Sequence, residues 1–220
     1  MIVLAVDGAL GAFSAAISRD DRIVASNREA GAVALERGLA MVETVFEQAR
    51  VAQAEIDRVA VGIGPGTFTG LRIAIAYAKS LAAVWRRPLV PISSFDLLEF
   101  GADFQSVLAV VEGRPGVISA RYRKGPDVRR ASGRIQEVID QLAKPSLWDN
   151  ETSPLRVVGA PKDVLHALAE RGIIVRSVDP VVTPAAAAAA LAASTLAPAR
   201  SVHEVRADYG ELPAVTMPKR

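Results

Sequence analysis

The sequence predicts an α/β protein of two related lobes, each built from a mixed sheet with flanking helices. Short apolar runs typical of buried strands alternate with stretches of helical periodicity along most of the chain. The segment VLAVDGALGAFSAAIS, residues 3–18, is echoed by VLAVVEGRPGVISARY, residues 107–122, with one extra residue in the second turn. Similar elements follow in a similar order, so the second half of the chain repeats the first.

The first lobe opens with three apolar runs separated by short turns, which predict a meander of three strands. The next stretch, residues 33–50, has apolar side chains at helical spacing on one face and glutamates elsewhere, as in an amphipathic helix. The elements expected in this lobe are strands at residues 2–6, 13–18, 23–26, 58–63 and 86–93, and helices at residues 33–50, 68–85 and near Phe95.

The second lobe is expected to continue, after its echoed hairpin, with helices and strands in the same alternation. These are helices at residues 134–142, 162–171 and from Pro184, and strands at residues 155–158 and 173–175. Thr183 is the predicted N-cap of the last helix, with Pro184 in its first turn. The join falls at residues 101–105, which gives a first domain over 1–102 and a smaller second domain over 103–220.

Two lobes that each begin with strand, turn and strand are typical of the actin-like, ribonuclease-H-like class. In that class the hairpin after the first strand cradles nucleotide phosphate, and the aspartate at the end of the strand lies near metal. Asp7 occupies this place in the sequence.

Composition excludes several classes of protein. The chain has 220 residues, half of them hydrophobic, so it can bury a proper core. Its formal charge of +2 does not by itself indicate a nucleic-acid or membrane partner, and the lack of cysteine excludes disulfides and thiolate ligands. The opening residues MIVLAVD lack the features of a secretory signal, and the most apolar run, residues 184–194, is too short to span a bilayer. A cytoplasmic protein with no membrane segment is expected.

A glycine-rich turn joins the strand at residues 58–63 to the helix at 68–85. It consists of Gly64, Pro65, Gly66, Thr67, Phe68, Thr69 and Gly70. It is not a P-loop, because Leu71 and Arg72 stand where lysine and serine or threonine are needed, and Thr69 replaces the third glycine of a dinucleotide fingerprint. Phe68 occupies the nucleophile position of a nucleophile elbow. Two interpretations stay open: a tight turn capped by Thr67 or Thr69, and an anion site at the helix start.

The helix at residues 68–85 is apolar nearly all round, interrupted mainly by Arg72 and Lys79. Such a helix needs cover on both sides. It lies either at the centre of the fold or at a subunit interface, where Ala76 and Ala83 would permit close approach of another helix.

Other polar residues give weaker signals. His166 and His203 lie in different segments, so no pair of imidazoles is available for a metal, and structural roles are favoured for both. One basic cluster stands out, comprising Arg121, Arg123, Lys124, Arg129, Arg130 and Arg134. A solvated hairpin is the favoured interpretation; contact with RNA phosphates is the alternative, with Tyr122 as the one aromatic side chain available for base stacking.

The segment GIGPGTFTGLRIAIAYAKSLA, preceded by VLAVD and followed by PLVPISSFDLL, resembles the TsaB family, the non-catalytic partner subunit in bacterial threonylcarbamoyladenosine synthesis on tRNA. The family pattern Gly-x-Gly-Pro-Gly-Ser/Thr-Phe-Thr-Gly-Leu/Val-Arg-Ile is matched from Gly62 through Ile73. The second-lobe segment VVEGRPGVISARY resembles the family at Arg114 and Gly116. The resemblance covers the first hundred residues well and the remainder mostly by layout.

The resemblance implies a two-lobed actin-like subunit with no catalytic residues and no metal of its own. A TsaD-like catalytic paralogue would transfer the threonylcarbamoyl group to N6 of adenosine 37 in tRNAs that read codons beginning with A, alongside a TsaE-like small ATPase. This chain would scaffold and activate that complex, meet tRNA only through it, and form a homodimer when alone. No cofactor of its own is expected, and ATP would enter only with the complex.

By the same resemblance, the first-lobe helices would form the partner interface. The interface residues expected are Leu39, Val42, Arg72, Ala76, Lys79 and Ala83. The chain departs from the family at Asp7, which is followed by Gly8 and Ala9 where the family has a hydroxyl residue. Asp7 would then mark a vestigial nucleotide site, without independent nucleotide binding.

Two enzymatic alternatives remain beside this interpretation. An ATP-dependent kinase or ATPase of the actin-like class would use Asp7 and the glycine turn to hold phosphate. A glycoprotease-type peptidase would need a metal pair or a nucleophile, and neither is visible in the sequence.

Overall fold

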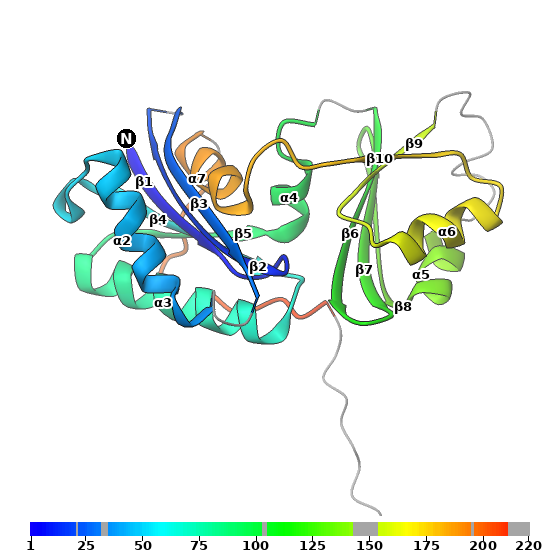
Figure 1. The fold of residues 1–220 in the computed structure, drawn as a ribbon, viewed down its shortest axis with the longest axis horizontal. Helices are drawn as coiled ribbons and strands as arrows, with labels where there is room; N and C mark the ends of the chain where they lie inside the picture. The colour runs from blue at the N-terminus through cyan, green and yellow to red at the C-terminus, as the bar shows by residue number, and fades with distance from the viewer. Residues whose placement is uncertain (21, 32–34, 103–104, 143–153, 195, 211–220) are drawn as a thin grey trace, which may run out of the picture.

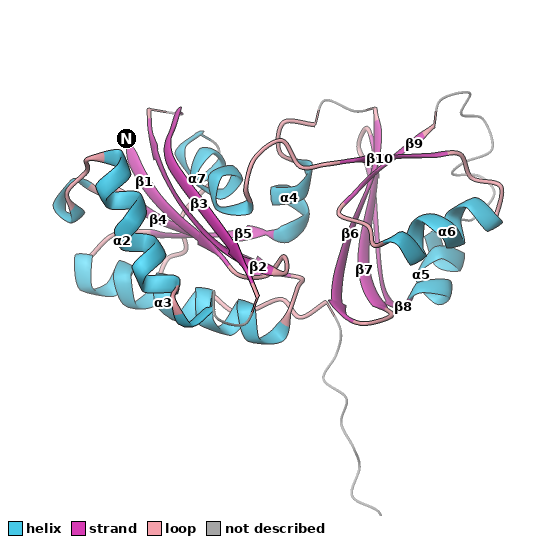
Figure 2. Cartoon of the chain, in the orientation of Figure 1, coloured by secondary structure: helices cyan, strands magenta, loops and turns pink. Residues whose placement is uncertain are grey.

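The computed structural model of the chain describes residues 1–20, 22–31, 35–102, 105–142, 154–194 and 196–210. Two lobes lie side by side, each with one five-stranded sheet and its own helices (Figure 1). Figure 2 shows that helices cover both faces of the first sheet and one face of the second. None of the described helices is both long and apolar enough to cross a membrane.

The first sheet has the strand order β3-β2-β1-β4-β5. Its strands are β1 (Ile2–Asp7), β2 (Ala12–Arg19), β3 (Arg22–Ala30), β4 (Arg58–Gly64) and β5 (Leu89–Ser93). The first three form the predicted antiparallel meander, and β4 and β5 join β1 in parallel. Because side chains alternate along a strand, each strand feeds two cores. In β1, Leu4 and Val6 face one core, whereas Val3 and Ala5 face the other.

Helices pack on both faces of this sheet, as its two-sided apolar pattern requires. Helices α2 (Gly38–Ala49) and α3 (Phe68–Trp85) cover the face of Leu4 and Val6, and α7 (Pro184–Ser194) covers the other face. A short 3-10 turn, η1 (Gln53–Glu55), precedes β4. The bounds of α3 are those predicted, whereas α2 begins later than expected, after a turn at Arg37; residues 33–34 lie outside the described part.

The second sheet repeats the first, with the order β10-β9-β6-β7-β8. Its strands are β6 (Ser106–Arg114), β7 (Val117–Lys124), β8 (Asp127–Arg134), β9 (Leu155–Val158) and β10 (Val175–Val178), and helices α5 (Ile135–Leu142) and α6 (Lys162–Glu170) cover one face. The echoed turns match in detail, because Gly11 and Gly116 occupy the left-handed region with φ of 75° and 76°. The internal repeat predicted from the sequence is therefore confirmed at the level of topology.

Two elements of the second half differ from expectation. Strand β8 was not predicted, because only Ala131 in it is buried and four of its residues are arginine or aspartate. Strand β10 begins at Val175, two residues later than predicted, because its register with β9 pairs Val175 with Leu155. Both are edge strands, where exposed side chains hide the alternation that marks a strand.

The end of the chain returns to the first lobe, although residues 103–220 were expected to form the second. Ser14 of β2 accepts a hydrogen bond from the Ala185 N–H, and the alanine side chains of α7 pack against the first sheet. Further on, the Ala199 N–H bonds to the Leu89 carbonyl and the Asp208 N–H to the Ile63 carbonyl. Small side chains let α7 lie close to the strands, a contact that the sequence order alone does not reveal.

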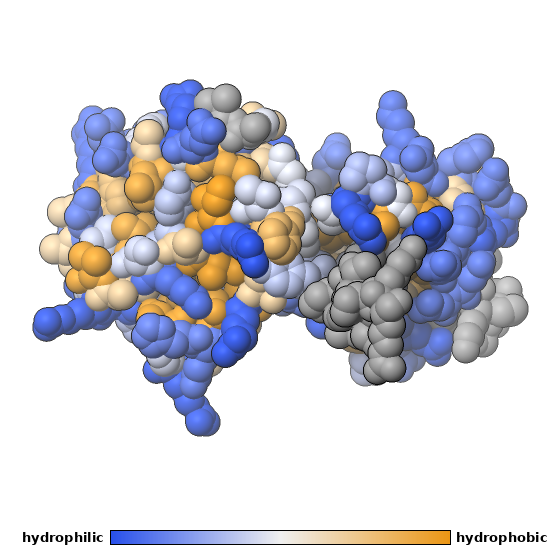
Figure 3. Space-filling model, turned by 90° about the horizontal axis from the view of Figure 1, so that it is seen from below, coloured by the Kyte–Doolittle hydropathy of each residue, from blue (hydrophilic) through white to orange (hydrophobic). Residues whose placement is uncertain are grey.

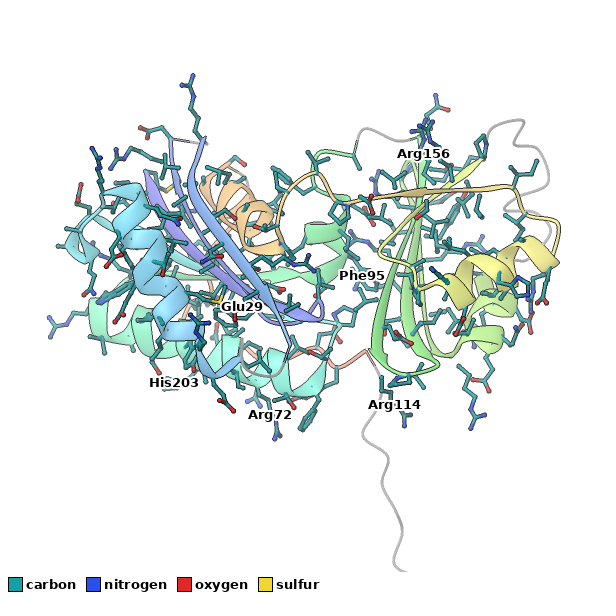
Figure 4. All side chains as sticks on the ribbon, in the orientation of Figure 1. Glu29, Arg72, Phe95, Arg114, Arg156 and His203 are labelled. Carbon is teal, nitrogen blue, oxygen red and sulfur yellow. The ribbon has the colours of Figure 1, made fainter. Side chains whose placement is uncertain are left out.

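Helix α4 (Ser94–Glu99) connects the lobes. Its Leu97 packs in the core under α7, whereas Phe95 and Leu98 pack with β6 of the second lobe. Figure 4 shows Phe95 lying between the two sheets. The last helix also begins as predicted, since Thr183 Oγ1 accepts a hydrogen bond from the Ala186 N–H at 3.2 Å.

Candidate functional site

The glycine turn packs directly against the loop that follows β1. A Cβ atom added to Gly70 would lie 1.8 Å from the Gly8 carbonyl oxygen, and one added to Gly8 would lie 2.5 Å from the Gly70 oxygen. A Cβ on Gly66 would meet the Ala9 oxygen at 2.4 Å. The glycines at 8, 66 and 70 are therefore needed because two stretches of main chain touch there.

Hydrogen bonds fix this contact. The Thr67 N–H donates to the Ala9 carbonyl at 2.9 Å, and the Thr67 hydroxyl donates to the Gly8 carbonyl at 3.2 Å. Thr67 stands at the N-cap position of α3, but its side chain makes no cap hydrogen bond, so the predicted capping role is wrong for this residue. These contacts favour the tight-turn interpretation, since they tie the turn to residues 8–9 and occupy the N–H and the hydroxyl of Thr67.

Substituting Gly70 tests this packing. Gly70→Ala is expected to lower the free energy of unfolding by about 2 to 3 kcal/mol, because the new methyl group overlaps main-chain atoms that cannot rotate away. Gly113→Ala is the matched control: its Cβ would come no closer than 3.5 Å to the Gly66 oxygen. Urea denaturation measures both, and equal stability of the two variants would contradict the close contact.

Asp7 lies at the end of β1, fully buried beneath the turn. Neither carboxylate oxygen makes a hydrogen bond of good geometry with a described residue, although the Ala9 and Leu10 N–H groups lie near the carboxylate, and a Cβ on Gly62 would lie 2.0 Å from Asp7 Oδ2. Burial raises the pKa of Asp7 to about 7, against the smaller lowering effects of the Ala9 and Leu10 N–H groups and the charge of Arg28.

A cleft of about 850 Å³ opens between the lobes beside this turn. Leu10, Arg28, Thr67, Glu112 and Asp179 are among the residues that line it. Its charged side chains are of both signs, with one arginine against two acids. Asp7 has no exposed surface and so does not reach the cleft. The two features predicted to share a nucleotide site are not brought together at one surface.

The outer face of α2 and α3 is the second candidate site, and it is exposed to solvent. Leu39 is 47% exposed, Arg72, Ala76 and Ala83 are exposed, and Lys79 is half-buried. A position for α3 at the centre of the fold is thereby excluded. Seen from below, apolar atoms gather over the first lobe whereas the second lobe is mostly hydrophilic (Figure 3).

Val42 is the exception among the predicted interface residues. It is 4% exposed and packs in the core between α2 and the first sheet. Its assignment to the surface is wrong, because Val42 lies with Gly38, Met41 and Val45 on the buried side of α2.

Sequence reasoning missed an aromatic cluster on the same outer face. The Phe68 and Tyr209 rings lie 5.2 Å apart, the Arg72 guanidinium lies 4.1 Å above the Phe68 ring, and Arg72 Nε donates to the Tyr209 hydroxyl at 3.2 Å. Phe68 remains 54% exposed and Val84, at the far end of α3, 78%. Figure 4 shows Arg72 on the outer side of α3. Only the fold brings Tyr209 to this helix, so the sequence carried no signal for the cluster.

The two histidines lie on the surface, in different segments of the chain. His166 Nε2 is 3.2 Å from a Glu170 carboxylate oxygen one helical turn away, and its side chain is 77% exposed. His203 is exposed, and its main-chain N–H donates a hydrogen bond to the Ser201 hydroxyl. Within the described ranges, no three His, Cys, Asp or Glu side chains come together as metal ligands.

The basic cluster divides into two groups. Arg121 is buried, and it donates to Glu99 at 2.9 Å and pairs with Asp96 at 2.7 Å; Arg123 pairs with the other Glu99 oxygen. These two arginines join the second sheet to α4, so they belong to a buried ion-pair network rather than to a solvated hairpin. Arg129, Arg130 and Arg134 on β8 are exposed.

Comparison with known proteins gives the following matches. A family model described as TsaD: tRNA N6-adenosine threonylcarbamoyltransferase matches residues 29–162. The tRNA threonylcarbamoyladenosine biosynthesis protein TsaB of Escherichia coli (strain K12) is 32% identical over 129 residues, which is 56% of each chain. An uncharacterised protein of Mycobacterium tuberculosis (strain H37Rv) is 33% identical over 165 residues, 73% of this chain and 72% of that one. The chain thus spans about half the length of the Escherichia coli relative.

Solved structures match along nearly the whole chain. YeaZ from Pseudomonas aeruginosa superposes with a TM-score of 0.70 at 23% identity, covering 94% of this chain and 99% of that one. Component A of (R)-2-hydroxyglutaryl-CoA dehydratase from Acidaminococcus fermentans reaches a TM-score of 0.50 at 14% identity, with 86% and 96% covered. With the duplicated sheet topology, these likenesses confirm the two-lobed actin-like fold class.

Proposed function

This chain belongs to the TsaB family, and from that membership we propose that it is a scaffold and activating subunit in tRNA threonylcarbamoyladenosine biosynthesis. It would act in the complex that transfers the threonylcarbamoyl group to N6 of adenosine 37 in tRNAs decoding codons that begin with A. A TsaD-like paralogue would carry the chemistry, and a TsaE-like ATPase would join them.

The observation that carries this proposal is the exposed apolar face of α2 and α3. Leu39, Phe68 and Val84 are large apolar side chains left in water, and Ala76 and Ala83 lie on the same face. Large apolar side chains that gather on one part of a surface indicate an interaction site, and apolar residues gather over the first lobe in Figure 3. Its small side chains allow a partner helix to approach closely, so a helical partner surface fits it best.

The aromatic cluster would supply the strongest contacts of that interface. Phe68, Arg72 and Tyr209 are of the types that dominate binding energy at protein interfaces, and they already hold one another in place. Prepositioned side chains lose less entropy on binding.

The glycine turn and Asp7 support a non-catalytic role. Main-chain contacts with residues 8–9 fill the space at the turn, and Asp7 is fully buried. A kinase or ATPase of this fold class would need the aspartate and the turn open to the same cleft. The alternative enzymatic function is therefore not favoured.

Ala76→Glu tests the interface. A buried, unpaired carboxylate at the contact is expected to weaken binding to the catalytic paralogue by at least about 100-fold. Ala169→Glu is the matched control, because Ala169 is exposed on α6 of the other lobe. Size-exclusion chromatography with light scattering, on the chain alone and mixed with the paralogue, measures the assembly.

The same measurement tests first the self-association of the chain and then its assembly with the paralogue. The chain alone is expected to run as a homodimer through the α2 and α3 face and to exchange into the heteromeric complex when the paralogue is added. Assembly that is equally tight for Ala76→Glu and Ala169→Glu would remove this face from the interface. A wild-type chain indifferent to the paralogue, yet hydrolysing ATP, would overturn the scaffold role itself.

A further inference from the structure

Strand β8 carries three exposed arginines and a single aspartate, so its exposed side chains are positive on balance. It is the outer strand of the second sheet, bonded to β7 on one side only (Figure 1). Arg129, Arg130 and Arg134 are exposed and form no ion pair with any residue that the structure describes. Asp127 is the single acid between residues 121 and 134, against six arginines and lysines.

The arginines of the neighbouring strand β7, in contrast, form ion pairs. Arg121 and Arg123 are matched by Asp96 and Glu99, which raise the pKa of Arg121 although its burial acts to lower it. Arg130 lies opposite Arg121 across the sheet, and both guanidinium groups lie over the Phe95 ring, at 5.6 and 5.2 Å. The acidic side chains of α4 therefore pair with the arginines of β7, whereas the β8 arginines are exposed to solvent.

The alternation of side chains spreads this charge around the edge. Ala131 faces the helix-covered core, so Arg129 points to that side of the sheet, and Arg130 to the side of α4. Arg134 lies about 13 Å along the strand from Arg130, at the usual rise per residue. The guanidinium groups therefore line the edge from both faces, and a cavity of about 420 Å³ lies beside Arg129 and Arg130, next to the end of α5.

We propose that the β8 edge binds the phosphate backbone of RNA, with Arg129 and Arg130 as its principal contacts; this deepens the proposed function by assigning the tRNA a surface on this subunit. Guanidinium groups match phosphate oxygens in pairs of hydrogen bonds. Tyr122, the aromatic residue of this segment, is 1% exposed in the second core and offers no ring to a base. Binding at this edge is therefore electrostatic and independent of base sequence.

The test is the salt dependence of tRNA binding. Unmodified tRNA transcript is titrated with the full chain, alone and with the catalytic paralogue, at several salt concentrations, and fluorescence anisotropy reports binding. Arg129→Ala/Arg130→Ala is expected to weaken binding and to reduce the slope of log K against log salt by about 1.4 to 1.8, the loss of two phosphate contacts. Arg19→Ala/Arg22→Ala, an exposed arginine pair on the β2–β3 hairpin, is the control and is expected to leave the slope unchanged.

The other outcomes overturn the proposal in distinguishable ways. Equal slopes for the two double variants would remove β8 from the RNA contact, and so would tRNA that fails to bind the wild-type chain in either form. If Arg129→Ala/Arg130→Ala instead no longer binds the paralogue, while the salt dependence of its tRNA binding stays unchanged, β8 is a protein interface. Failure of the wild-type chain to assemble with the paralogue, read by light scattering, would count against the proposed function and leave the tRNA measurement on the chain alone to decide this inference.

Discussion

Glu99→Ala is expected to lower the free energy of unfolding by about 2 to 3 kcal/mol, because it removes the carboxylate that Arg121 and Arg123 share and leaves the buried Arg121 guanidinium with Asp96 alone. Glu99 accepts from Arg121 and Arg123 with opposite oxygens, both at 2.9 Å. The Glu99 and Arg121 side chains are 7% and 8% exposed. This pair joins α4 to β7, and thus the first lobe to the second, so we also expect the two lobes to unfold less cooperatively in the variant.

Asp140→Ala is the control for this prediction. It breaks the ion pair with Arg171, in which Asp140 is 65% exposed, and exposed pairs contribute about 0 to 1 kcal/mol. Chemical denaturation followed by far-ultraviolet circular dichroism measures both variants. A loss in Glu99→Ala no larger than that in Asp140→Ala would show that the buried network does not stabilise the join between the lobes.

Asp7 makes the chain less stable as the pH rises from about 4 to about 7. Its pKa is 3.8 in the unfolded chain and about 7 when buried, so between these values the folded protein keeps a proton that the unfolded chain has released. Unfolding then releases one proton, and raising the pH favours it by about 1.4 kcal/mol per pH unit. The stability contributed by the neutral form is fully present below pH 4 and is lost by about pH 7.

Asp7→Asn removes this titration. The difference in free energy of unfolding between the variant and the wild type is expected to rise by about 4 kcal/mol from pH 4 to pH 7 in favour of the variant. The wild type loses stability over this range, whereas the amide of the variant stays neutral throughout. Asp20→Asn is the control: the hydrogen bond from the terminal ammonium lowers the pKa of the exposed Asp20, so the stability that this group contributes changes only below about pH 4, and the variant is expected to differ from the wild type by a constant amount between pH 4 and pH 7. Urea titrations at several pH values compare the three chains, and a constant difference between Asp7→Asn and wild type would contradict the buried neutral carboxyl.

Elements with strong periodicity were predicted nearly to the residue. Helix α3 and strands β1, β2 and β4 have apolar patterns that one buried face or a central strand position imposes. Edge strands were predicted poorly, as β8 and β10 show, because solvent on one side lets their side chains be charged. Helix α7 was found as a helix but expected in the wrong lobe, since composition does not say which sheet an alanine-rich helix covers.

The candidate sites divide in the same way. The glycine turn follows from local sequence, because glycine spacing is a local property, whereas the exposure of one face of α3 was one of two alternatives that only the tertiary structure decided. Val42 was misplaced, since Leu39 and Val42 lie near the edge of one apolar stripe of α2 and only packing against the sheet decides which of them is buried. The Phe68, Arg72 and Tyr209 cluster and the pairing of Glu99 with Arg121 join residues that are far apart in the chain.

The sequence by itself determined the two-lobed fold, the duplication and the family, because strand and helix periods and a twelve-residue motif need only local order. The tertiary structure alone decided which basic side chains form ion pairs and which stay exposed to solvent. Six cations between residues 121 and 134 look equivalent in the chain, but α4 neutralises Arg121 and Arg123 and leaves Arg129 and Arg130 exposed. Electrostatic pairing depends on distance in space, and only the folding of one lobe against the other sets those distances.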